Sequence, residues 1–381
     1  MKKIERFVRG GYVTYFDSDK YVMIPDEIGE KEKETRGVWF STVANIDFEV
    51  MTDVESFKTY LLSVIKKVKE YHFNTWSRFI TGEEDKFPGF DILGWFIDEA
   101  KKENVDVHAW INPYRVSNLK FTDKFKTKDE FLDSLSPKNF ARKHKDLVIE
   151  TVLDKLILDP ASEEVQDFVS ETALEIAKNY DVKAIHIDDY FYPYEAIRDP
   201  NEEQKHQGST LSLDDWRRQN VSKLMEKIST KLKSLPKKVE FGISPFGIYR
   251  TKDIHFQKFN KKGGWEKGSN NHYSCFQGYD GLYADVLLWM EKGWIDYVVP
   301  QVYFEFDNYN VDKETNEIVE RAKYADLVDW WNWACKQTQT KLYIGQGLYR
   351  YSDEGNWQNS EEIINQLKYN QTKDYVSGVV M

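Results

Sequence analysis

Residues 184–193 read Ala-Ile-His-Ile-Asp-Asp-Tyr-Phe-Tyr-Pro, an apolar run that ends in two carboxyl groups and then in aromatic residues. Alternation along a β-strand places His186 and Asp188 on one face and Ile185 and Ile187 on the other. The polar face is therefore not expected to pack against an apolar core, and solvent or a substrate would cover it instead. A competing interpretation is that Asp188 and Asp189 only cap the turn that follows the strand.

Short apolar runs of this kind recur along the chain and alternate with helical patterns. Strands are expected at 37–42, 106–112, 184–190, 240–245, 297–303, 341–347 and 378–381. Apolar residues at helical spacing predict helices before residue 71 and over 91–103, 163–179, 213–232, 283–292, 324–338 and 360–370. This alternation is typical of repeated βα units and indicates a parallel sheet or barrel.

Polar and aromatic residues follow most of these strands. The residues that come after successive strands include Asn45, Asn112 to Arg115, Tyr249 and Arg250, Tyr303 to Glu305, and Tyr349. Because the active site of a (β/α)8 TIM barrel lies at the carboxyl ends of its strands, this pattern favours that fold. An open doubly wound sheet is disfavoured, since no glycine-rich phosphate loop follows an early strand.

The composition of the chain disfavours several classes of function. The chain has 381 residues and a formal net charge of −11, which argues against binding to nucleic acids or to anionic lipid surfaces. Its two cysteines, Cys275 and Cys335, provide neither a disulfide framework nor a metal-binding spacing. No membrane span and no signal peptide are visible in the sequence. We expect residues 1–34 to form an extension or linker and residues 35–381 to form one barrel domain.

Six motifs occur in a fixed order from about residue 36 to the end of the chain. They are Arg-Gly-Val-Trp at 36–39, Trp-Ser-Arg-Phe-Ile-Thr-Gly at 76–82, His-Ala-Trp-Ile-Asn-Pro-Tyr-Arg at 108–115, His-Ile-Asp-Asp-Tyr-Phe-Tyr-Pro at 186–193, Gly-Ile-Ser-Pro-Phe-Gly at 242–247, and Gly-Trp-Ile-Asp-Tyr-Val-Val-Pro-Gln-Val-Tyr at 293–303. Together they resemble glycoside-hydrolase-like family ten, a family of bacterial envelope barrel proteins. The resemblance implies hydrolysis of glycosidic bonds in a bacterial polysaccharide, with peptidoglycan glycan strands as a target class of one branch. It also implies an extracytoplasmic or cell-envelope location.

Two departures from the family pattern concern the barrel itself. The family has a second strand and its loop between the helix ending near Tyr71 and the motif at 76–82, whereas here Thr75 meets Trp76 directly. The chain also stops at Met381, inside the expected eighth strand. The sequence therefore predicts a barrel lacking one strand and the closing helix, unless residues 75–81 take the second position.

Glycoside hydrolysis usually requires two carboxyl groups, one on each side of the scissile bond. Neighbouring residues of a strand point to opposite faces, so only one of Asp188 and Asp189 would face the cleft, and the alternation favours Asp188. The second carboxyl group must then come from another strand. Glu305 is the first choice for the acid, because aromatic surroundings would raise its pKa. An equally open interpretation is a solvated loop glutamate.

Candidate substrate-binding residues surround these carboxyl groups in the predicted barrel. They are Asn112, Tyr114, Arg115, Trp110, His186, Tyr190, Tyr192, Arg250, Gln301, Tyr303 and Tyr349. The polar members would hydrogen-bond sugar hydroxyls, and the aromatic members would stack on pyranose rings, although core packing is an equally open role for each ring. Arg115 would alternatively pair with Asp188 or Asp189 and lower a carboxyl pKa.

Two other functions stay open. The first is a carbohydrate-binding barrel that has lost catalysis, which a missing strand would favour. The second is a metal-dependent barrel such as a polysaccharide deacetylase, which would need His108, His186 and Asp188 together. The histidines and cysteines lack metal-binding spacings, so no metal and no cofactor is expected.

Overall fold

The computed structural model describes residues 1–31, 33–41, 47, 51, 53–79 and 87–381. Within them, parallel strands close into an eight-stranded barrel in the order β10-β11-β14-β15-β3-β4-β5-β8. The barrel strands are β3 (Thr35–Phe40), β4 (Thr75–Phe79), β5 (Asp106–Ile111), β8 (Ala184–Ile187), β10 (Glu240–Ile243), β11 (Tyr297–Val298), β14 (Lys341–Gly345) and β15 (Val376–Val380). The predicted (β/α)8 fold class is confirmed.

Helices lie between the barrel strands, and those at 54–70, 92–102, 163–179, 213–233, 286–291, 324–338 and 362–370 lie at or near the predicted positions. The helices are α1 (Val54–Glu70), α2 (Ile92–Lys102), α3 (Lys128–Ser134), α4 (Phe140–Lys143), α5 (Glu163–Asn179), α6 (Glu202–His206), α7 (Leu213–Lys233), α8 (Asp253–Gln257), α9 (Gly278–Gly281), α10 (Val286–Glu291), α11 (Tyr324–Thr338) and α12 (Glu362–Asn370). None of those in the described part of the chain is long and apolar enough to cross a membrane.

The predicted loss of a barrel strand was wrong. Strand β4 takes the second position and pairs with β5 in parallel register, with Trp76 opposite Val107. The chain reverses directly from the end of α1 into this strand, through a turn in which His72 adopts a positive φ of 61°. Trp76 is fully buried and packs edge-on against Phe40 and Phe96.

The last strand of the barrel is also present. β15 pairs in parallel with β14 on one side and with β3 on the other, where Gly378 lies opposite Thr35. This contact is close, because a Cβ on Gly378 would lie 2.1 Å from the Thr35 carbonyl oxygen. Thr42 at the end of the first predicted strand, Asn45 after it, and the motif residues 80–82 lie outside the described residues.

The chain divides into two compact units. One consists of residues 1–38, 242–279 and 286–381, and the other of residues 39–241 and 280–285. We call them the terminal unit and the central unit.

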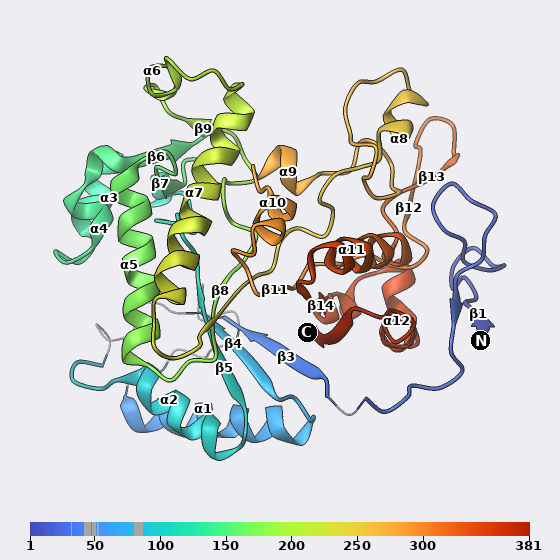
Figure 1. Ribbon diagram of the computed structural model, residues 1–381, viewed down its shortest axis with the longest axis horizontal. Helices are drawn as coiled ribbons and strands as arrows, with labels where there is room; N and C mark the ends of the chain where they lie inside the picture. The colour runs from blue at the N-terminus through green and yellow to red at the C-terminus, as the bar shows by residue number, and fades with distance from the viewer. Residues whose placement is uncertain (32, 42–46, 48–50, 52, 80–86) are drawn as a thin grey trace. The chain divides into compact units, whose positions relative to one another are not determined.

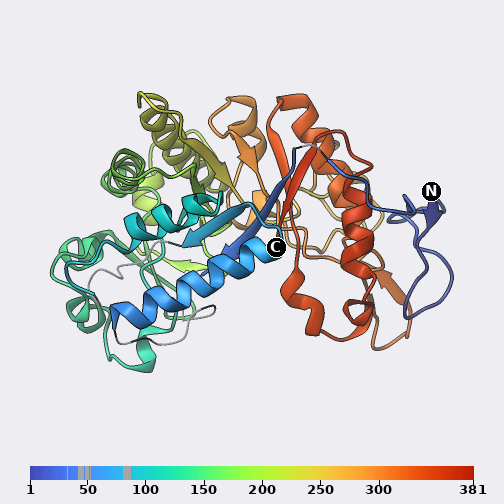
Figure 2. The same cartoon turned by 90° about the horizontal axis from the view of Figure 1, so that it is seen from below.

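In the central unit, local signals in the sequence set the helix boundaries. Ser162 caps α5 by accepting a hydrogen bond from the Val165 amide, and Ser212 caps α7 in the same way through Asp215. These two helices pack side by side (Figure 1), and α1, the long blue helix in the foreground of Figure 2, packs against α2. A small sheet of order β7-β6-β9 lies outside the barrel and consists of β6 (Val148–Thr151), β7 (Leu156–Leu158) and β9 (Ile197–Arg198).

In the terminal unit, the segment 1–34 contacts the C-terminal elements. It contains the short pair β1 (Lys2–Lys3) and β2 (Met23–Ile24), and it lies outside α12 in both views (Figures 1 and 2). Arg9 forms an ion pair with Asp307, and the Phe16 amide donates to Asp326 at 2.9 Å. A hairpin of β12 (Tyr309–Val311) and β13 (Ile318–Glu320) belongs to the same unit.

Candidate active site

Asp188 lies in the central unit directly after β8, buried and held by three hydrogen bonds. The Asn112 side-chain amide donates to both carboxyl oxygens, at 3.1 and 3.0 Å, and the Tyr190 backbone amide donates to Oδ1 at 2.9 Å. The register of β5 against β8, with Ile111 opposite Ile187, brings Asn112 beside Asp188. Two residues that the sequence places 76 positions apart therefore meet at one site.

The surroundings of Asp188 favour its protonated form. Removal from water raises the pKa of Asp188 most strongly, and the neighbouring Asp189 raises it further. The Tyr190 amide, the Arg115 charge and the Asn112 amide act in the opposite direction and lower this pKa. Burial prevails, so the pKa of Asp188 reaches about 7. A carboxyl group of this kind can hold a proton near neutral pH and release it to a leaving group.

Asp189 is equally buried, but it has different partners. The Tyr194 hydroxyl donates to its Oδ2, and the Tyr194 ring packs edge-on against Tyr190 at 5.5 Å between centroids. Burial and the Asp189 charge both raise the pKa of the Tyr194 hydroxyl, which therefore stays protonated as a donor. The two adjacent aspartates thus have separate supports, Asn112 for one and Tyr194 for the other.

An aromatic cluster lies on the strands next to these carboxyl groups. The Trp39 ring is 4.8 Å from His186 and 5.4 Å from Trp110, measured between centroids. His186 is fully buried, and desolvation together with the nearby His108 lowers its pKa well below the usual value, so the ring is neutral. Among the described residues, no group of three or more histidine, cysteine, aspartate or glutamate side chains could hold a metal ion.

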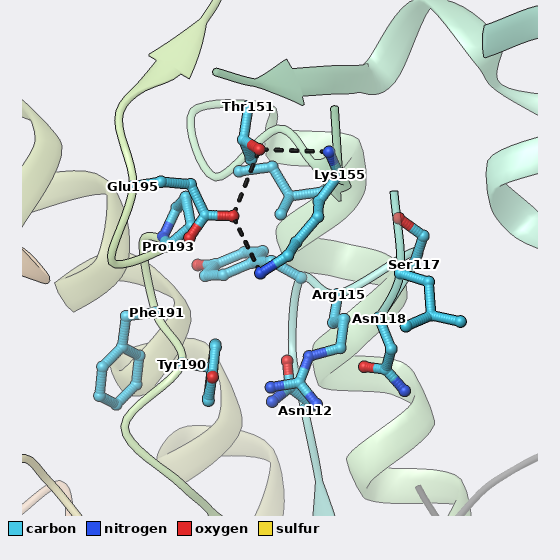
Figure 3. Close-up of a pocket in the computed structure, with 13 residues that line it drawn as sticks. Asn112, Arg115, Ser117, Asn118, Thr151, Lys155, Tyr190, Phe191, Pro193 and Glu195 are labelled. Carbon is cyan, nitrogen blue, oxygen red and sulfur yellow. Dashed lines mark hydrogen bonds and ion pairs between the residues drawn. The ribbon is translucent and has the colours of Figure 1, made fainter. Parts of the chain in front are cut away.

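A hollow of about 290 Å³ opens in the central unit beside Asn112 (Figure 3). Its lining includes the predicted residues Tyr114, Arg115 and Tyr190, and the Arg115 guanidinium lies 4.0 Å from the Tyr190 ring centroid. Tyr192, also predicted to bind sugar, is instead 3% exposed and packs edge-on against Tyr283.

Sequence reasoning missed part of this hollow. Lys155 and Glu195 form an ion pair at 3.4 Å, and the Thr151 hydroxyl donates to Glu195 at 3.3 Å. Ser117 and Asn118 also line the hollow. Thr151 ends β6 and Lys155 lies in the following turn, and nothing in the local sequence of this outer sheet indicates that it reaches the site.

The remaining predicted residues belong to the terminal unit. Burial raises the pKa of Glu305, the predicted acid. The Tyr303 ring packs edge-on against Tyr349 at 5.7 Å, and Tyr349 is 71% exposed. The Gln301 amide donates to the Ser244 carbonyl oxygen at 2.9 Å, and Arg250 donates to the Gly264 carbonyl oxygen at 3.0 Å.

Residues 34–361 match the family model described as Glycosyl hydrolase-like 10. The chain belongs to this family. Glycosyl hydrolase YngK of Bacillus subtilis (strain 168) is 32% identical over 379 residues, covering 92% of this chain and 68% of that protein. Glycosyl hydrolase DigH of Escherichia coli (strain K12) is 30% identical over 397 residues, covering 94% of this chain and 84% of that protein. The family predicted from the six motifs is confirmed.

Comparison with solved structures supports the fold. The glycoside hydrolase domain of PgaB (BpsB) from Bordetella bronchiseptica superposes with a TM-score of 0.50 at 11% sequence identity, covering 91% of this chain and 94% of that domain. At this identity, the likeness concerns the barrel architecture alone.

Proposed function

We propose that the protein is a glycoside hydrolase that cleaves a bacterial polysaccharide, with peptidoglycan glycan strands as the first substrate to test, outside the cytoplasm. Family membership supports the reaction class. The observation that carries the proposal is Asp188, a buried carboxyl group with a raised pKa, held by Asn112 at the carboxyl end of a barrel strand.

In the proposed mechanism, Asp188 protonates the glycosidic oxygen as the bond to the anomeric carbon breaks. In the same step a second carboxyl group attacks the anomeric carbon as the nucleophile, or acts as the base that takes a proton from the attacking water. Glu305, which the sequence favoured as the acid, is the candidate for this second role. Asp188 is the better candidate for the acid because its pKa lies near neutrality, where a proton donor works best. Asp189 is the alternative for either role.

The test uses purified glycan strands, with and without stem peptides, and measures new reducing ends. Asp188→Asn and Glu305→Gln should each reduce kcat by at least about 100-fold, as the loss of a general acid or base does. Asp326→Asn is the matched control, because Asp326 is also buried with a pKa raised to about 7, but it lies on α11 and accepts a hydrogen bond from the Phe16 amide. Full activity of either test variant would refute the role of that residue.

A barrel that only binds carbohydrate was the sequence-based alternative, and it rested on a missing strand. Since the barrel is closed, that argument no longer applies. Retention of wild-type protein on a glycan affinity gel, without release of reducing ends from any glycan, would favour it again.

A further inference from the structure

The hollow beside Asn112 is lined by a cation, Arg115, whose charge also acts on Asp188. Arg115 forms no ion pair within the described residues, and its guanidinium lies over the face of the Tyr190 ring, 4.0 Å from the ring centroid. Other partly buried arginines differ, since Arg217 binds Glu202 through two nitrogens. An arginine that lines a hollow and forms no ion pair among the described residues is available to a negatively charged ligand.

Two residues of the lining also carry a buried polar atom that has no hydrogen-bond partner among the described residues. The Tyr114 hydroxyl and the Asn112 side-chain oxygen are buried, and neither has a hydrogen-bond partner in the described part of the chain. Tyr114 is only 1% exposed, and burial keeps its hydroxyl protonated by raising its pKa. A buried polar atom without a partner costs free energy, and a polar ligand in the hollow would remove that cost.

The other charged groups of the hollow neutralise each other. Lys155 pairs with Glu195, which also accepts the Thr151 hydroxyl (Figure 3). This pair carries no net charge. Among the described residues of the lining, Arg115 is therefore the charged group that can favour an anionic ligand over a neutral one. In a protein with a formal net charge of −11, an anionic glycan is not attracted by the protein as a whole, so its recognition depends on such a local cation.

We propose that this hollow binds a sugar unit that carries a carboxylate, which pairs with Arg115, while Tyr114 and Asn112 bind the polar groups of the same unit. The inference rests on the proposed function, because it names the class of glycan that the site accepts. Planar guanidinium and carboxylate groups match in a bidentate geometry, and the Tyr190 ring holds the guanidinium on one face. The carboxylate could belong to a uronic acid or to the lactyl ether of muramic acid.

The test compares each polymer with its own carboxyl-reduced form, in which carboxylates have become alcohols. The polymers are peptide-free peptidoglycan strands and a uronic-acid polymer, and the proteins are wild type, Arg115→Gln, Arg115→Lys and the control Arg198→Gln. Arg198 belongs to the same unit but pairs with Asp154 outside the lining. Wild type should prefer the native form of one polymer by about 10- to 100-fold in kcat/KM, as expected for a charged hydrogen-bonded pair.

Arg115→Gln should lose this preference, Arg115→Lys should keep part of it, and the control should keep all of it. The polymer that shows the preference identifies the source of the carboxylate. Equal rates on native and reduced forms of both polymers, or an unchanged preference in Arg115→Gln, would overturn the inference. If wild type hydrolyses neither polymer, the proposed function fails, and equilibrium binding of the same pairs still tests the carboxylate site.

Discussion

Replacing Asp188 by asparagine is expected to stabilise the folded protein above neutral pH while it reduces kcat by at least about 100-fold. The free-energy argument starts from the protonation equilibrium of the carboxyl group. Burial raises the pKa of Asp188 from 3.8 to about 7, so the folded protein favours the neutral form. Asparagine is a neutral group of nearly the same shape and needs no proton to be tolerated there.

The sign of the pH dependence follows from linkage. A carboxyl group whose pKa is higher in the folded state binds a proton more tightly when folded, so it favours folding below pH 3.8. That contribution is lost as the pH rises to the folded-state value of about 7. Each pKa unit corresponds to about 1.4 kcal/mol, so ionised Asp188 costs about 4 kcal/mol of folding free energy at about pH 8.

The Asp188→Asn variant avoids the cost of ionisation, but it loses part of the hydrogen bonding that Asp188 provides. The asparagine that replaces Asp188 would have one oxygen left to accept hydrogen bonds, and its own amide group would face the donor group of Asn112. Losing one hydrogen bond to a charged group costs about 2 kcal/mol, so we expect a net stabilisation of about 2 kcal/mol at about pH 8. This stabilisation should disappear towards acidic pH, where Asp188 is protonated in the folded protein.

Urea denaturation of wild type and Asp188→Asn at about pH 4 and about pH 8 measures this difference. Asp326→Asn should show a similar pH-dependent gain, since burial raises the pKa of Asp326 to about 7 as well, but it should keep its activity. An equal stability change at both pH values would show that ionisation of Asp188 does not carry the penalty. No gain at the higher pH would show that the folded site stabilises the carboxylate instead.

Three further predictions concern activity. With Asp188 as the acid, kcat should fall about tenfold per pH unit above about pH 7, because the donor loses its proton; a flat profile through the alkaline range would contradict the assignment. Asn112→Ala removes the amide that donates to both Asp188 oxygens, so it should raise the pKa of Asp188 and lower kcat/KM by about 10- to 100-fold. The alkaline fall in kcat should then begin at higher pH; a fall at the wild-type pH would contradict this role of Asn112. Tyr349→Ala removes a ring that is 71% exposed, so KM on long glycans should rise about threefold to tenfold with an unchanged melting temperature; an unchanged KM would remove Tyr349 from the predicted binding residues.

The sequence predicted the barrel because most of its strands are recognisable as short apolar runs. Residues 184–187 and 240–243 are buried throughout, which is typical of strands in a parallel barrel and easy to recognise. β4 lacks this pattern, since Thr-Trp-Ser-Arg-Phe contains three polar residues and only two aromatic ones. Residues 75–81 were predicted to take the second position only as an alternative, because the family pattern places another strand between the helix that ends near Tyr71 and the motif at 76–82.

The pairing of Asn112 with Asp188 follows from topology and was within reach of the sequence. Both residues come directly after strands, and those strands are neighbours in parallel register. Carboxyl ends of adjacent parallel strands meet at one edge, so side chains just beyond them contact each other. The contribution of Lys155 and Glu195 to the hollow could not be predicted from the sequence, because a helix and a barrel strand separate these two residues along the chain. Only the folded outer sheet brings them together.

The two adjacent aspartates carry an unfavourable free energy that core residues would not. Buried carboxyl groups next to each other raise each other's cost of ionisation, and an apolar pair would remove this cost altogether. The structure instead supports each one separately, with the Asn112 amide on Asp188 and the Tyr194 hydroxyl on Asp189. The turn-capping interpretation accounts for the hydrogen bond from the Tyr190 amide to Asp188, but not for a second strand that supplies a side-chain donor to the same carboxyl group. An arrangement that holds a proton-binding group in a fixed position, at a cost to stability, is what an acid catalyst requires.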